Sequence, residues 1–173
     1  MERAVKIFLF FSISLVCYSC GVYGFRGNNP PEGINSIAIP TFIDVSGFSA
    51  PTLAENFTQR LKDKIISDNT FRVADKNIAD AVLNGTITNV TDEALVISSG
   101  DNVPEDVSRR KITITVNVSF DNLKKQKNIW NKNFVNYGEY RSSNNSFSER
   151  SEGTELAVMR ITEDILIDLT SNW

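Results

Sequence analysis

Cys17 and Cys20 are the only thiols among the 173 residues of this sequence, and two residues separate them. Cysteines at this spacing occur in thiol redox motifs and as half of many zinc sites. A zinc site needs two further ligands, but the sequence has no third cysteine and no histidine. A redox pair needs a βαβ context, whereas these residues close the most apolar stretch of the chain. Redox and metal chemistry are therefore not predicted at this pair.

The apolar stretch has the pattern of a secretory signal peptide. Arg3 and Lys6 come first, and an uncharged apolar run follows from Ile7 to Val16. A bilayer is spanned by about 20 apolar residues, so this run is too short for a retained transmembrane anchor. Residues 1–19 are therefore predicted to be removed after export.

The end of the stretch resembles a bacterial lipobox, in which signal peptidase II cuts before a cysteine whose thiol carries diacylglycerol. Ser19 supplies the small residue before Cys20, although Cys17 stands where lipoboxes prefer leucine. Cys17 is a worse candidate for modification because Val16 precedes it, and a disulfide between the two cysteines would be lost with the cut. We predict lipidation at Cys20, with diacylglycerol and an N-acyl chain as the anchor and no other cofactor.

The composition excludes several classes of function. The chain is 41% hydrophobic and 23% charged, which is typical of one globular domain. Its net charge of −3 disfavours nucleic acid as a partner. Without residues 1–19 the charge is −4, which disfavours attachment to anionic lipid by overall charge. The sequence lacks histidine, the usual general base, and it has no G-x-S-x-G motif. A lipid-anchored hydrolase is therefore disfavoured, and no catalytic residue is predicted.

Two basic clusters stand out on this acidic chain. They are Arg109-Arg110-Lys111 and Lys124-Lys125-x-Lys127. Lipid phosphates would suit either cluster, and arginine offers bidentate contacts where lysine offers point charges. The alternative is that basic side chains at a hairpin edge and tip prevent pairing with foreign strands. About ten residues at ~3.4 Å each separate the clusters, so they lie on the order of 30 Å apart and cannot form one small site.

The residues after the signal peptide divide into a tether and one domain. Residues 20–34 contain four glycines and Pro30-Pro31, which favour an extended tether. The domain is predicted over residues 35–173. It opens with an apolar strand over 36–43 that lies at a sheet edge or a bulge, because Pro40 has no N–H to donate.

Two helices are predicted from apolar stripes of helical period. The first begins near Pro51, with Ser49 as a cap, and its stripe is Leu53, Phe57, Leu61 and Ile65. The second follows a polar loop over 141–153 and begins near Thr154. Its stripe is Val158, Ile161, Ile165 and Leu169.

Alternating apolar and polar residues predict the remaining strands. A short strand is predicted over 71–74 and a longer one over 81–90, where Leu83, Gly85, Ile87 and Asn89 share a face. Gly85 indicates a bend or a close backbone approach. Residues 111–140 form a long hairpin with one buried and one wet face, which is typical of antiparallel strands. This order predicts an α+β two-layer sandwich, with two helices packed on a mainly antiparallel four-stranded sheet.

Several short motifs occur in a characteristic order along the mature chain. They are Cys20-Gly21-x-Tyr23-x-Phe25, Ile37-x-Ile39-x-x-Phe42, Pro51-x-Leu53, Phe57-Thr58-x-x-Leu61, Leu83-x-Gly85-x-Ile87 and Asn172-Trp173. Each is a packing pattern, but their order behind a lipobox resembles a divergent branch of the LptE-like outer-membrane lipoproteins. The resemblance covers Cys20 to Trp173. The family's fold, two helices over a four-stranded sheet, is similar to the one predicted above.

The resemblance implies a non-enzymatic function at the outer membrane, with the protein facing the periplasm or a barrel lumen. Its partners would be an LptD-type β-barrel, which it plugs and helps to assemble, and lipopolysaccharide. The candidate lipopolysaccharide contacts in this sequence are Arg109, Arg110, Lys111, Lys124, Lys125 and Lys127. The alternative is a periplasmic lipoprotein of secretion-pore or scaffold type that forms a homo-oligomer, because Ile37-Ala38-Ile39-Pro40 before a helix also occurs in such proteins.

Overall fold

The computed structural model describes residues 31–95, 108–142 and 146–171. The signal peptide, Cys20, most of the tether and the terminal Asn172-Trp173 lie outside these residues. The elements are β1 (Ser36–Ala38), β2 (Ile43–Asp44), α2 (Leu53–Asp68), β3 (Arg72–Val73), β4 (Ala81–Leu95), β5 (Ser108–Asn122), β6 (Lys127–Ser142) and α3 (Ser146–Ser171). Ile34, the last residue of the predicted tether, is buried in the core.

The strands form one mixed sheet of six strands in the order β3-β1-β4-β5-β6, with β2 also paired to β4. β4, β5 and β6 are antiparallel, whereas β1 runs parallel to β3 and β4, and β2 runs parallel to β4. The prediction of an α+β fold is confirmed. The prediction that the sheet has four, mainly antiparallel, strands was wrong. The parallel strands are two or three residues long, which is too short to show a period in the sequence.

The predicted strand over 36–43 is divided at Pro40. Only Ser36–Ala38 pairs on two sides, and the chain rejoins the sheet at Ile43. β1 therefore lies inside the sheet, and the edge position predicted for this segment belongs to the short β2. A residue without an N–H cannot continue a central ladder, which explains the break.

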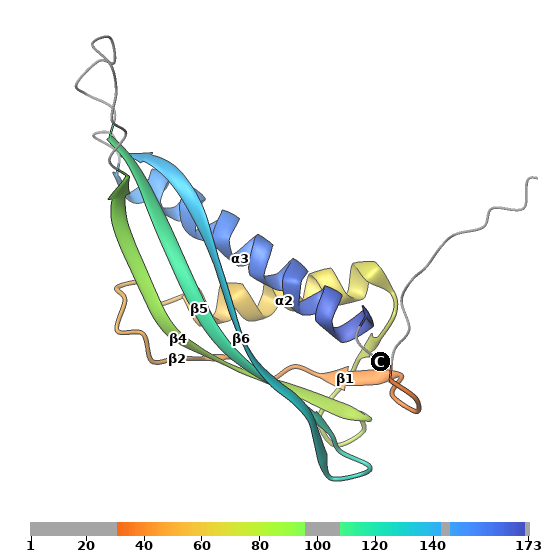
Figure 1. Cartoon of the computed structure of the whole chain (residues 1–173). Coiled ribbons are helices and arrows are strands. Elements are labelled where there is room, and N and C mark those ends of the chain that lie inside the picture. Colours follow the sequence, from red (N-terminus) through yellow and green to blue (C-terminus); the bar gives the residue numbers. More distant parts are fainter. Residues whose placement is uncertain (1–30, 96–107, 143–145, 172–173) are drawn as a thin grey trace, which may run out of the picture.

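Both helices cover one face of the sheet (Figure 1). The stripe predicted for α2 is confirmed, because Leu53, Phe57, Leu61 and Ile65 are at most 2% exposed. The helix is preceded by Thr52 rather than Ser49, and no side chain caps its first turn. It ends at Asp68, and the next residue, Asn69, adopts the left-handed conformation with φ 60°. Asparagine tolerates this conformation better than most residues, so the helix stops there.

The long hairpin is confirmed, and its apolar residues Ile112 to Phe120 are buried on the helix side. Gly85 is also confirmed as a point of close approach, since an added Cβ would lie 1.9 Å from the ring of Phe42. The face predicted for Asn89 was wrong. A bulge at Thr88 shifts the register, so that Asn89 is exposed and Val90 is buried.

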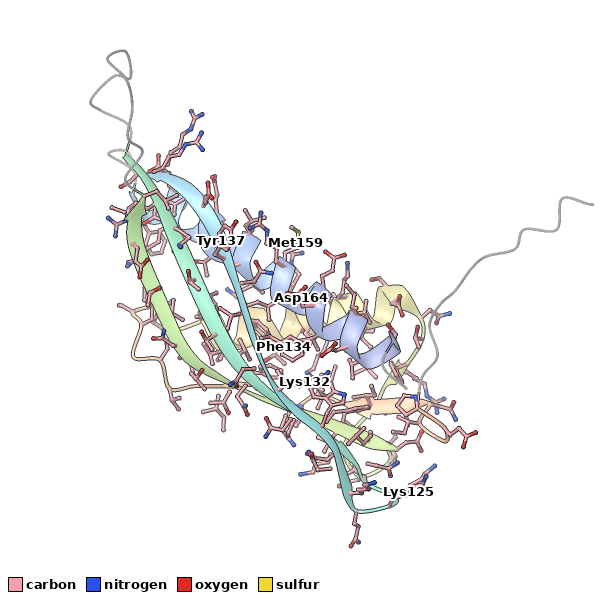
Figure 2. All side chains as sticks on the ribbon, in the orientation of Figure 1. Lys125, Lys132, Phe134, Tyr137, Met159 and Asp164 are labelled. Carbon is pink, nitrogen blue, oxygen red and sulfur yellow. The ribbon has the colours of Figure 1, made fainter. Side chains whose placement is uncertain are left out.

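The last helix begins at Ser146, so the loop predicted over 141–153 was wrong over most of its length. Gly153 is a helical residue, and an added Cβ there would lie 2.8 Å from the ring of Tyr140. Figure 2 shows α3 running along β6. Lys132 Nζ lies 2.8 Å from the Asp168 carboxylate, and Asn136 Nδ2 lies 3.0 Å from that of Asp164. These contacts join the helix to the last strand.

Candidate functional site

The face of β4, β5 and β6 that points away from the helices is polar. Among the described residues, no helix covers it (Figure 1). Many of its side chains are half-buried or exposed hydroxyls and amides, which include Thr86, Thr113, Thr115, Asn117, Ser119, Asn131 and Asn133. The exposed Val135 and Tyr137 lie among them on β6. Asn117 Nδ2 donates to Asn131 Oδ1 and to Asn133 Oδ1, each at 2.8 Å. We call this surface the polar sheet face. It offers donors and acceptors across three strands.

The three residues of the first basic cluster do not form one site. Side chains alternate along β5, so Arg109 and Lys111 point to the polar sheet face and Arg110 points to the helix side. Arg109 Nη1 lies 3.9 Å from Glu139 Oε2, and Lys111 Nζ lies 5.6 Å from the ring centre of Tyr137. Only two of the three predicted contacts are therefore available on one surface.

Arg110 belongs to an internal network around the Asp92 carboxylate. Its Nε donates to Asp92 Oδ1 at 2.9 Å, and its Nη2 donates to the Asp92 backbone carbonyl at 3.0 Å. The Tyr140 hydroxyl lies 2.8 Å from Asp92 Oδ2, and Arg150 Nε donates to the same oxygen at 3.1 Å. The network therefore joins β4, β5, β6 and α3, and Arg110 already has a carboxylate partner.

The electrostatics of this network agree with its geometry. Hydrogen bonds from Arg110 to Asp92 and Tyr140 raise the pKa of the guanidinium. Burial raises the pKa of the Tyr140 phenol, and its hydrogen bond to Asp92 adds to the effect. Arg150 extends the network outward, since its guanidinium lies 4.6 Å from the ring centre of Phe48. All four side chains thus have well-defined internal partners.

The structure adds one basic residue that the sequence did not single out. Arg141 is paired with Arg109 across β5 and β6, and both side chains are exposed on the polar sheet face. Like charges directly opposite each other in a sheet repel, and a bound anion would relieve that repulsion. Arg109 and Arg141 are therefore the arrangement on this face that suits a phosphate, whereas Lys111 is paired in register with Glu93 and Glu139.

The second basic cluster is also divided by its contacts. Lys124 forms an ion pair with the buried Asp80, which also accepts hydrogen bonds from Asn35 N, Ser36 N and Ser36 Oγ at 2.9–3.0 Å. The Lys124 ammonium and these donors hold the pKa of Asp80 far below its usual range. Lys125 and Lys127 are exposed and form no ion pair with the described residues. Figure 2 shows Lys125 at the hairpin tip.

A groove of about 410 Å³ separates the first turns of α2 from the first half of α3. Phe48, Leu53, Val158 and the 83% exposed Phe147 line it. Its charged side chains balance, because Arg60 and Arg150 are accompanied by Asp63 and Glu155. Within the described ranges, no group of three or more metal-ligating side chains occurs. The same ranges contain no helix that is long and apolar enough to cross a membrane.

The family profile described as "LptE: Lipopolysaccharide-assembly" matches residues 34–172. The chain belongs to the LptE family. The predicted resemblance is thereby confirmed over the whole folded domain. No curated protein matches the chain.

Solved structures share the fold of this LptE-family chain at low sequence identity. The hypothetical protein CT253 from Chlamydia trachomatis is 11% identical, with a TM-score of 0.54 over 80% of this chain and 99% of that one. A minor lipoprotein from Acinetobacter baumannii is 9% identical, with a TM-score of 0.51 over 79% and 92%. The PelC dodecamer from Paraburkholderia phytofirmans is 11% identical, with a TM-score of 0.51 over 83% and 94%. At these identities the likeness shows the fold alone.

Proposed function

We propose that this LptE-family protein is a non-enzymatic outer-membrane lipoprotein that plugs an LptD-type β-barrel and supports the assembly of that barrel. Family membership over residues 34–172 carries the proposal. The polar sheet face supports it, because the interior of a large membrane barrel is polar and wet. The protein would be held at the membrane by the lipid on Cys20.

The dimensions of the sheet also suit a plug. β4, β5 and β6 contain 15, 15 and 16 residues, which correspond to about 50 Å at ~3.3 Å per residue. The barrel's apolar band is ~25 Å tall, so the strands are longer than the lumen that they would pass through. The Asn117 hydrogen bonds hold the amides of Asn131 and Asn133 in place on this face.

The same protein would assist lipopolysaccharide on its way to the outer leaflet. Arg109 and Arg141 would contact its phosphates, with Lys111 as a neighbouring charge. Of the six predicted contacts, Arg110 and Lys124 have internal carboxylate partners in this fold. Their charges therefore contribute to the stability of the fold, and we assign the lipopolysaccharide contact to Arg109 and Arg141.

Co-purification tests the partnership with the barrel. Tagged protein extracted in mild detergent should bring down a large outer-membrane β-barrel. Asn117→Arg, which adds bulk and charge to the polar sheet face, should release that barrel. Glu55→Arg, an exposed change on α2, should retain it. The proposal fails if the wild-type protein never brings down a barrel, or if both variants behave alike.

A ring-shaped homo-oligomer is the second candidate function. One observation favours it, namely that PelC, which shares the fold, was solved as a dodecamer. Electron microscopy of the detergent-purified protein distinguishes the two candidates. Closed rings of this chain alone would support a scaffold, whereas a complex with one barrel would support the plug.

A further inference from the structure

Three segments meet at the end of the sheet where the tether joins the fold. The Asp80 carboxylate binds Asn35 N and Ser36 N of the first segment. The Asp80 carbonyl accepts a hydrogen bond at 2.9 Å from Leu123 N in the hairpin turn. Leu123 also packs against a small cluster that includes Ala79. Residues 31–36, 72–80 and 123–127 therefore form one continuous surface, which we call the tether end.

The tether end is basic on an otherwise acidic chain. Its three segments carry five basic and three acidic side chains. Lys62 of α2 adjoins them, because it lines the same depression as Arg72 and Lys76. Among the described residues, none of Lys62, Arg72, Lys76, Lys125 and Lys127 is in an ion pair. The excess is three positive charges once Lys62 is included, whereas the whole chain carries −3.

An exposed apolar side chain accompanies these charges. Ile78 is 75% exposed, and with Pro40 it lines the depression between β1, β3 and the loop that follows. An apolar residue surrounded by lysine and arginine is typical of surfaces that rest in the headgroup region of a bilayer. A protein partner with an acidic rim would match the same side chains, so the choice of a membrane rests on the tether, which joins the fold at this end.

We infer that the tether end docks on the surface of an anionic phospholipid bilayer. The inference rests on the proposed function in one respect, namely the lipid on Cys20. Ten residues separate Cys20 from Pro31, so a fully extended tether of eleven Cα–Cα steps reaches about 40 Å. This end is thus held near the membrane, and short tethering raises its effective concentration there. β4, β5 and β6 run from this end to the opposite end of the molecule (Figure 1), so the polar sheet face would extend away from the bilayer surface.

Vesicle flotation with unlipidated protein tests the surface without the anchor. A chain that begins at Gly21 keeps all of the core residues of the described ranges, the first of which is Ile34. This protein should float with phosphatidylcholine vesicles that contain phosphatidylglycerol, and not with vesicles of phosphatidylcholine alone. High salt should abolish the binding, because it screens exposed charges. Equal binding to both vesicles, or binding to neither, would overturn the inference.

Charge-matched variants locate the surface. Lys125→Glu should lower the partition coefficient about fivefold or more, and Lys76→Glu/Lys125→Glu about 25-fold or more. Arg60→Glu changes the net charge as Lys125→Glu does, but it lies in the groove between α2 and α3 and should leave binding unchanged. Ile78→Ser should weaken binding at low salt without altering its salt dependence. An equal loss in Arg60→Glu would show that only net charge matters and would defeat the inference.

The barrel assay separates this inference from the proposed function. Lys76→Glu/Lys125→Glu should lose vesicle binding and still bring down the barrel. If it instead kept vesicle binding and lost the barrel, the tether end would be a protein-docking surface and the inference would be wrong. If the wild-type protein bound anionic vesicles but no barrel, the proposed function would fail while the membrane contact stood.

Discussion

Gly138 of β6 lies so close to Gly153 of α3 that a Cβ on Gly138 would come within 1.9 Å of the Gly153 carbonyl oxygen. The obstacle is backbone, which cannot rotate away as a side chain can. The absence of both side chains therefore allows the first turns of α3 to rest directly on the last strand.

Gly138→Ala should accordingly lower the free energy of unfolding by about 1–3 kcal/mol, the usual cost of overpacking. Urea denaturation measures this loss. Val135→Ala is the matched control on the same strand, since Val135 is 56% exposed and its truncation should change stability by less than about 0.5 kcal/mol. Equal stability of the two variants would show that α3 is not held at this contact.

Neighbouring arginines should behave differently when truncated. Arg110→Ala removes two hydrogen bonds to Asp92, whose side chain is 9% exposed, and should cost about 1–3 kcal/mol in chemical denaturation. Arg109→Ala removes a long, exposed contact and should cost less than about 0.5 kcal/mol. Arg109→Ala should nevertheless weaken lipopolysaccharide binding. If lipopolysaccharide binding were lost only in Arg110→Ala, our assignment to the polar sheet face would be incorrect.

Tyr140 should make stability depend on alkaline pH. Burial and the Asp92 hydrogen bond raise its pKa in the folded state above the usual 10.0. A raised pKa means that its contribution is complete below pH 10 and is lost as pH rises through the folded value. The wild-type protein should therefore lose stability above pH 10 more steeply than Tyr140→Phe. Thermal unfolding of the wild-type protein and of Tyr140→Phe at a series of pH values measures this difference. If the stability of both proteins fell in parallel with pH, the ionisation of Tyr140 would not be linked to unfolding.

The fold was predictable where periodicity is long. The apolar residues from Ile112 to Phe120 alternate over most of a strand, and the stripe from Leu53 to Ile65 repeats over about three turns, so their burial followed from sequence alone. The start of α3 was missed because its first turns are polar and contain Gly153. In a sequence alone, a polar segment with a glycine indicates a loop. Ser146-x-x-Glu149 has capping-box spacing and was the available signal.

The place of Arg141 opposite Arg109 on the polar sheet face could not be predicted from the sequence pattern. The register of β5 and β6 slips by one residue between Phe120 and Asp121, where Ile129 is the extra residue. Counting outward from the hairpin turn without this bulge pairs Arg109 with Tyr140 instead. A slip of one residue also exchanges the two faces of a strand. The pairing of Arg109 with Arg141 therefore depends on a local irregularity that has no clear signature in the sequence.

Asp80 should make stability depend on acidic pH as well. Its pKa is depressed in the folded state, first by Lys124 and then by backbone and hydroxyl donors. A depressed pKa means that the contribution is present above the unfolded value near 4 and is lost as pH falls through the folded one. Asp80→Asn should cost about 1–3 kcal/mol at neutral pH, because Asn35 and Ser36 lose a charged acceptor. The difference in free energy of unfolding between the wild-type protein and Asp80→Asn should become smaller as the pH falls.

Lys124→Gln and Lys125→Gln separate the ion pair from the charge of the turn. The two lysines are adjacent and exposed, but only Lys124 reaches Asp80. Lys124→Gln should therefore flatten the acid dependence of unfolding, whereas Lys125→Gln should reproduce the wild-type profile. If both lysines altered the profile equally, general charge repulsion at the turn would explain the acid sensitivity. The ion pair between Lys124 and Asp80 matters because Asp80 joins the start of the fold at Asn35 to the hairpin turn. Protonation of Asp80 should therefore loosen the tether end.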